Sequence, residues 1–117
     1  MISLNIGGTY FFTSKSTLQK HSSFFSSLMT WQTPLEKNEY FVDRDPTHFR
    51  YILNYMRGSK YLPNNTCILE ELLEEADFYC MEALKKTIEC KLEKLCQIGS
   101  IEMELYLLRQ KISLMHH

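Results

Sequence analysis

The sequence predicts an α+β domain, with short strands mostly near the N-terminus and a cluster of helices after them. Two patterns predict this class. Hydrophobic residues alternate with polar residues at the start of the chain, as in a strand with one buried face. From Phe49 onwards they recur every three or four positions, as in amphipathic helices. Because the strands precede most of the helices, a doubly wound parallel sheet is not expected.

The first elements are predicted to form a β-hairpin. Ile2, Leu4 and Ile6 alternate with polar residues and indicate the first strand. Gly7-Gly8 suits a two-residue turn, because glycine adopts the positive φ of a type I′ turn. The β-branched and aromatic segment Thr9–Thr13 is the second strand.

Serine residues are predicted to begin two short helices after the hairpin. Either Ser14 or Ser16 caps the first helix, and Ser16 would do so as part of a capping box. Either Ser22 or Ser23 caps the second. The polar segment 30–38 contains a proline and is expected to be a loop.

A short strand over residues 40–42 leads into a strong helix signal. Asp45 is a good N-cap, and Pro46 suits the first helical position, where its missing N–H is not needed. Gly58 is predicted to end this helix in a left-handed conformation, and residues 60–62 to form another short strand. The apolar stripe of the helix consists of Phe49, Ile52, Leu53 and Met56.

Three further helices are expected, and the first two start at Thr66 and Met81. Gly99-Ser100 is predicted to end the second of them, so that residues 1–97 form one domain and residues 98–117 a C-terminal helical extension. The extension carries a short heptad seam, which we expect to pack on the domain or on a neighbouring chain. Its members are Ile101, Leu105, Leu108, Ile112 and Met115.

Composition narrows the classes of function. The 117 residues carry a net charge of −1, so no global positive field recruits nucleic acid. No apolar run is long enough for a membrane span and no signal peptide is visible, so we expect a cytoplasmic protein without a membrane partner. Charge is uneven locally, and the acidic and basic faces are either solvated or contacts between copies. The acidic residues are Glu70, Glu71, Glu74, Glu75, Asp77 and Glu82, and the basic ones are Lys85, Lys86, Lys91 and Lys94.

The four cysteines are expected to be free thiols, because nothing indicates export to an oxidising compartment. No C-x-x-C pair is present, so a zinc finger is not expected and no cofactor is assigned. Zinc held between subunits stays open as an alternative, because sequence spacing does not exclude it. Its candidate ligands are His21, Cys80, Cys90 and Cys96.

Several segments together resemble the potassium-channel tetramerisation branch of the BTB/POZ fold. They are Ile-Ser-Leu-Asn-Ile-Gly-Gly-Thr at 2–9, Tyr-Phe-Val-Asp-Arg-Asp-Pro at 40–46, the helix at 48–57 and Leu-Leu-Glu-Glu-Ala-Asp-Phe-Tyr at 72–79. The resemblance implies a BTB/POZ fold and a stand-alone adaptor that acts in protein–protein interaction and homo-oligomerisation, with three to five subunits. It implies no enzyme, and no nucleophile or general base is grouped with the carboxylates at 43 and 45.

The resemblance also implies polar contacts between subunits. The positions that match are Asp43, Arg44 and Asp45, followed by Asn5 and Thr9. Charged hydrogen bonds across an interface set register and partner choice. Alternatively, Asp45 only caps its helix and Arg44 steadies the turn, and both roles can hold at once.

Partners other than copies of the chain are also implied by the resemblance. Many stand-alone relatives recruit a cullin scaffold, so one alternative function is a ubiquitin-ligase substrate adaptor. Another is an assembler or inhibitor of other BTB-containing proteins. One channel branch binds zinc through a histidine, a cysteine six residues later and a Cys-Cys pair. Here Ser27 stands six residues after His21 and there is no Cys-Cys pair, so that site is not expected.

Overall fold

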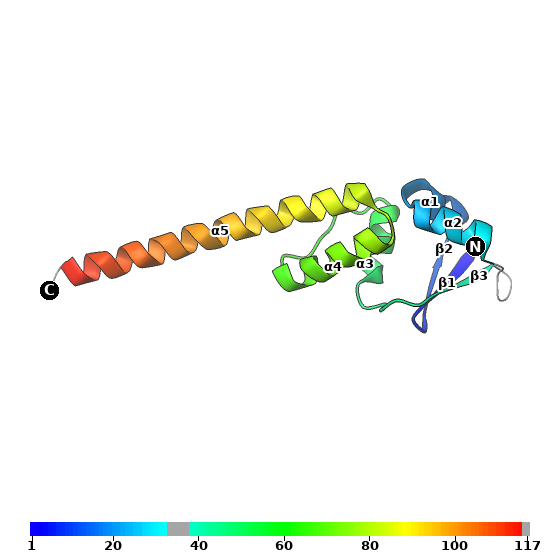
Figure 1. Ribbon diagram of the computed structural model, residues 1–117, viewed down its shortest axis with the longest axis horizontal. Helices are drawn as coiled ribbons and strands as arrows, with labels where there is room; N and C mark the ends of the chain where they lie inside the picture. The colour runs from blue at the N-terminus through cyan, green and yellow to red at the C-terminus, as the bar shows by residue number, and fades with distance from the viewer. Residues whose placement is uncertain (33–37, 116–117) are drawn as a thin grey trace.

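The computed structural model describes residues 1–32 and 38–115. For residues 98–104 and 110–115 it describes the backbone only. The molecule is elongated, 75 × 24 × 19 Å, because its last helix extends far beyond the domain (Figure 1). The elements in chain order are β1 (Ile2–Ile6), β2 (Thr9–Thr13), α1 (Lys15–His21), α2 (Ser23–Trp31), β3 (Glu39–Val42), α3 (Phe49–Met56), α4 (Thr66–Phe78) and α5 (Glu82–Met115). This order confirms the predicted α+β class.

The described strands form one three-stranded sheet in the order β2-β1-β3. β1 and β2 are antiparallel with Ile6 opposite Thr9, so the predicted two-residue hairpin is confirmed. Gly7 and Gly8 have φ values of 56° and 103°, which glycine adopts at little cost. β3 is parallel to β1, with Ile6 beside Val42. The ends of β1 and β3 therefore lie at the same end of the sheet.

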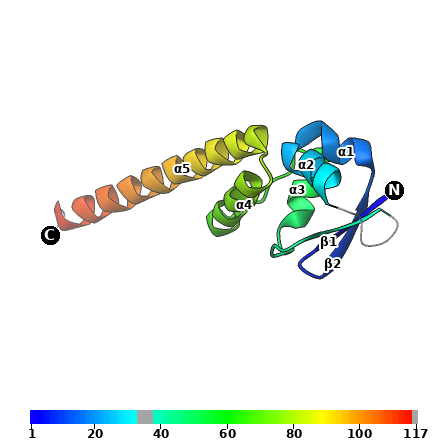
Figure 2. The same ribbon diagram turned by 45° about the vertical axis from the view of Figure 1, so that its right-hand side comes forward.

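The inner face of the sheet is covered by α1, α2 and α3, which Figure 2 shows together on one side of it. Leu4 and Ile6 of β1 are fully buried beneath these helices, as are Leu18 of α1 and Phe25 of α2. α4 and α5 form an antiparallel pair beside this layer (Figure 1). Tyr79, in the turn between them, is fully buried and stacks on Phe25 with ring centroids 5.2 Å apart.

In each of the two pairs of candidate serine caps, the earlier residue is the N-cap. The Ser14 hydroxyl accepts a hydrogen bond from the Thr17 amide at 3.2 Å, and Ser22 accepts one from Phe25 at 3.4 Å. The Ser22 hydroxyl also donates to the carbonyl of Tyr79 at 2.7 Å, which ties α2 to the end of α4. The capping box at Ser16 is not formed. The predicted loop over 30–38 lies mostly outside the described residues.

The predicted start of α3 at Pro46 is wrong by three residues, because the helix begins at Phe49. The preceding residues form one tight turn, in which the Phe49 amide donates to the Pro46 carbonyl at 3.1 Å. The end of the helix is as predicted. Gly58 has a φ of 100°, and its amide and that of Ser59 close the last turn on carbonyls of α3.

Two other expectations are wrong. Residues 60–62 form no strand, since this connection pairs with none of the described strands. Gly99-Ser100 does not end a helix, since α5 continues through it to Met115. An interior glycine costs about 1 kcal/mol, which the strong helix formers on both sides tolerate. The boundary at residue 97 therefore falls inside α5, and the division into two parts remains a prediction.

The C-terminal half of α5 lies away from the rest of the domain (Figure 1). Leu105 and Leu108, two members of the predicted heptad seam, are half exposed. These two residues do not pack on the domain of their own chain. The remaining members of the seam are outside the described side chains.

Candidate functional site

The five residues expected at a subunit contact lie in or beside two turns at one end of the sheet. Asn5 and Thr9 flank the hairpin turn, and residues 43–45 form the turn between β3 and α3. The two turns touch at Gly7, whose amide donates to the Val42 carbonyl at 2.9 Å. The Cα of Gly7 packs so closely on the Arg44 carbonyl that a Cβ there would collide with it.

Two of the five stabilise their own turns. Asn5 Oδ1 accepts a hydrogen bond from the Gly8 amide at 2.7 Å. Asp45 Oδ1 accepts one from the Thr47 amide at 2.9 Å and another from the Thr47 hydroxyl. These bonds lower the pKa of the Asp45 carboxyl, because they favour its charged form. Asp45 therefore caps the tight turn before α3 and not α3 itself.

Arg44 holds the turn to α4. Its Nη2 and Nε donate to the two carboxylate oxygens of Glu75 at 2.7 and 3.2 Å, which is a bidentate ion pair. The guanidinium carbon also lies 4.3 Å above the centre of the Phe78 ring. The Glu75 hydrogen bond raises the pKa of Arg44 further above its ordinary value. Sequence reasoning included Glu75 in the acidic run but carried no signal for this pairing.

Thr9 and Asp43 are exposed and form no side-chain hydrogen bond or ion pair among the described residues. Arg44 keeps 30% of its side-chain surface exposed. The structure therefore gives Asn5, Arg44 and Asp45 roles within one chain and leaves Thr9 and Asp43 available to a partner.

The outer face of the sheet carries aromatic residues that sequence reasoning did not single out. Tyr10 lies opposite Asn5, and Phe41 lies on the other side of Asn5, so all three share this face. Phe12, opposite Ser3, is on the same face. Tyr10, Phe12 and Phe41 are 52%, 53% and 38% exposed. Because Leu4 faces the core, alternation along the strand places Asn5 on the outer face. The pairing of the strands, which the sequence does not give, would then have placed the aromatic residues beside it.

Both edges of this sheet are partly covered by side chains. Gln32 forms two hydrogen bonds with the backbone of Phe41, at 3.1 and 3.3 Å, and so occupies the outer edge of β3. Arg57 donates to the Phe12 carbonyl at the outer edge of β2. These bonds hinder strand addition at either edge. The aromatic face is left as the surface of the sheet open to another protein.

The four residues named for an intersubunit zinc site do not form a group of metal ligands among the described residues of one chain. His21 packs edge-on against Tyr55, and Cys80 lies in the α4–α5 turn with a φ of 57°. Cys90 and Cys96 are on α5. All four cysteines are free. Within the described ranges, no three His, Cys, Asp or Glu residues are grouped as metal ligands.

Comparison with known proteins identifies the family. The model of the BTB/POZ domain matches residues 2–90, which include the hairpin, both turns, α4 and the beginning of α5. The chain belongs to the BTB/POZ family. The matched range includes Gly7 and Arg44, which hold the two turns against each other and against α4.

The relatives place this BTB/POZ domain in the KCTD-like branch, as predicted. Human BTB/POZ domain-containing protein KCTD5 is 37% identical over 99 residues, which is 80% of this chain and 42% of the relative. Human KCTD17 is 35% identical over 98 residues, covering 80% and 31%. A zebrafish BTB/POZ domain-containing adapter for CUL3-mediated RhoA degradation is 34% identical over 97 residues, covering 80% and 29%.

The chain thus spans less than half the length of these relatives. Among the described residues, no helix is both long enough and apolar enough to cross a bilayer.

Proposed function

We propose that this BTB/POZ chain is a cytoplasmic, non-catalytic adaptor that assembles with copies of itself, in groups of three to five. The observation that carries the proposal is the outer face of the sheet, where Phe12 and Phe41 are exposed on a domain of an interaction family. Exposed aromatic residues grouped on one face are typical of interface centres.

The polar residues around this face fit the rim of such an interface. Thr9 and Asp43 are exposed at the end of the sheet with no partner among the described residues. Asp45 is exposed beside them, and Arg44 offers the part of its guanidinium that Glu75 leaves open. Asn5, beside Phe41, completes the set. Rim contacts of this kind set the register of subunits more than their affinity.

The proposal is tested by removing the aromatic face without touching the core. The double variant Phe12→Ser/Phe41→Ser is expected to shift the assembly towards monomer in sedimentation experiments. Tyr61→Ser is the matched control, because Tyr61 is 70% exposed in the connection between α3 and α4, which is not part of the sheet. Unchanged assembly of the double variant, with its helical circular dichroism intact, would contradict the proposal.

The partner of the assembled adaptor is a second question. A cullin scaffold is supported by the zebrafish relative, whose name describes an adapter for CUL3-mediated degradation. The alternative is a structural assembler or inhibitor of other BTB-containing proteins. A pull-down with a cullin N-terminal region separates them, and absence of binding at micromolar concentration would exclude the cullin adaptor.

The zinc alternative is tested in the same assembly. A zinc ion clamped between subunits through His21 or the cysteines would make the assembly sensitive to a chelator. Without such a clamp, the assembly keeps its mass and melting temperature in the chelator.

A further inference from the structure

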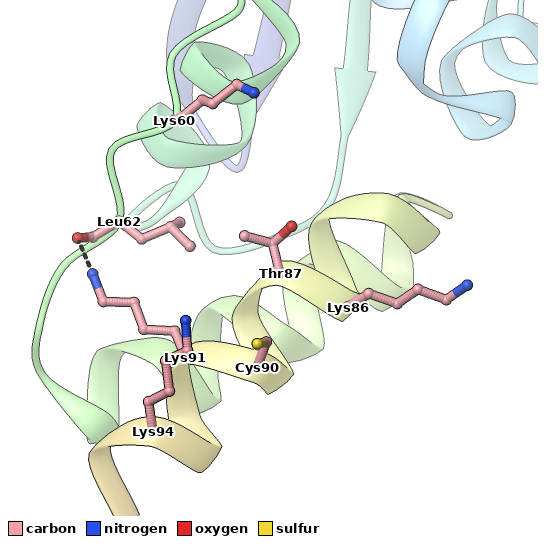
Figure 3. A pocket seen from close by; sticks show the side chains of 7 residues that line it. All are labelled: Lys60, Leu62, Lys86, Thr87, Cys90, Lys91 and Lys94. Atoms are coloured by element: carbon pink, nitrogen blue, oxygen red, sulfur yellow. Dashed lines mark hydrogen bonds between the residues drawn. The ribbon is translucent and has the colours of Figure 1, made fainter. Parts of the chain in front are cut away.

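A groove lies between the α3–α4 connection and α5, away from the sheet (Figure 3). Its volume is about 550 Å³, within the range of ligand-binding clefts. One wall is the extended connection with Lys60 and Leu62, and the other is a stripe of α5. The residues of that stripe are Lys86, Thr87, Cys90, Lys91 and Lys94.

The charge of the groove is of one sign. Four of its seven lining residues are lysines and none is acidic. None of these four lysines forms an ion pair among the described residues. By contrast, Lys85, one position outside the groove, pairs with Asp77 at 2.8 Å. Grouped like charges repel one another, so an anionic occupant would relieve this repulsion.

The floor of the groove is mainly apolar. Leu62 is buried, and Thr87 and Cys90 face it across the cavity (Figure 3). Lys91 donates to the Leu62 carbonyl at 2.8 Å, which holds the connection against α5 and fixes the width of the groove. Its ammonium is therefore built into the wall, while Lys86 and Lys94 are exposed at the rim.

We propose that this groove binds an acidic peptide segment of a partner protein, with carboxylates at the lysine rim and an apolar side chain on the floor. Charge complementarity selects the acidic partner. A nucleic acid is not favoured, because none of the seven described residues that line the groove is aromatic and able to stack on a base. The site goes beyond self-assembly, since one chain supplies every residue that lines it.

The experiment measures fluorescence anisotropy of a labelled peptide of four Glu-Glu-Leu repeats, titrated with the full chain. The peptide with Gln in place of Glu is the probe control. Lys86→Gln/Lys94→Gln removes two rim charges without touching Lys91. Lys15→Gln/Lys20→Gln makes the same change on two exposed lysines of α1.

The Glu peptide is expected to bind and the Gln peptide not to bind. The α5 double variant should weaken binding about tenfold, which is about 1.4 kcal/mol, and the α1 double variant less than twofold. Half-molar salt should weaken the binding of the Glu peptide to the wild-type chain, because salt screens the exposed charges at the rim.

Any of four results in the binding measurements would overturn the proposal. The first two are that the Glu peptide does not bind, or that the Gln peptide binds equally well. The third is that the two double variants lose affinity for the Glu peptide equally. The fourth is that an oligothymidine displaces the labelled Glu peptide at the same concentration as the unlabelled Glu peptide does.

Light scattering is recorded on the same samples, to measure assembly. If the α5 double variant loses assembly and the α1 double variant does not, the groove is a contact between copies, and the proposal is also overturned. If the α5 double variant loses peptide binding and keeps its assembly, the proposal is supported. A monomeric wild-type chain that binds the Glu peptide would contradict self-assembly and leave the groove standing.

Discussion

Gly7 packs against the carbonyl of Arg44, and this contact joins the hairpin turn to the turn that follows β3. The two turns are far apart in the sequence, and both lie within residues 2–90, which match the BTB/POZ domain. Arg44 in turn reaches Glu75 of α4. One glycine and one arginine therefore connect the sheet to the helical part of the domain.

Gly7→Ala is expected to destabilise the fold by about 3 kcal/mol. This is the cost of a positive φ at a residue with a Cβ, added to the cost of the collision of that Cβ with the Arg44 carbonyl. Gly8→Ala is the matched control, because Gly8 also has a positive φ but no atom within 4 Å of an added Cβ. It should cost about 1–2 kcal/mol. Chemical denaturation of both variants makes the comparison, and equal losses would show that the packing on Arg44 contributes nothing.

Arg44→Met is expected to lower the free energy of unfolding by about 1–2 kcal/mol, because it leaves the mostly buried Glu75 carboxylate without its partner. Arg50→Met is the control, since Arg50 is exposed and lies only above the Tyr51 ring. It should change stability by less than about 0.5 kcal/mol. A double-mutant cycle with Glu75→Gln measures the coupling, and a coupling near zero would remove Arg44 from the account of the fold.

Tyr79→Phe is expected to raise stability by about 1 kcal/mol. Among the described residues, the Tyr79 hydroxyl is buried without a hydrogen-bond partner. Burial, followed by the nearby Glu75 carboxylate, raises the pKa of this hydroxyl well above its ordinary value. Phenylalanine keeps the ring stacked on Phe25 and removes the unsatisfied group. A lower melting temperature for Tyr79→Phe would show that the hydroxyl has a stabilising partner.

The Asp45 cap is expected to depend on pH. Hydrogen bonds from Thr47 lower the pKa of the Asp45 carboxyl below its ordinary 3.8, so its contribution is complete above that pH. The contribution is lost as the pH falls through the lowered value. In thermal melts, Asp45→Asn should be a few degrees less stable than wild type near neutral pH, and this difference should disappear towards about pH 2. A pH-independent difference between Asp45→Asn and wild type would argue against the cap.

The hairpin and the apolar stripe of α3 could be predicted from sequence because periodicity and glycine geometry are local properties. The start of α3 could not be predicted, because Asp45 and Pro46 are also common in a tight turn that ends before the helix begins. The pairing of Arg44 with Glu75 depends on tertiary packing, which no spacing reports. The continuity of α5 shows that one Gly-Ser pair does not overcome helix formers on both sides.

The candidate site was only partly accessible to sequence reasoning. Resemblance selected the five turn residues, but the structure shows that Asn5 and Asp45 already serve their own turns. The aromatic face containing Phe12 and Phe41 depends on strand register, and the lysine groove depends on where the α3–α4 connection crosses α5.

Self-assembly is the central claim, and the mass of the unmodified chain in solution tests it most directly. Light scattering after size exclusion, at tens of micromolar, is expected to give three to five times the monomer mass. A clean monomer at that concentration would contradict the account.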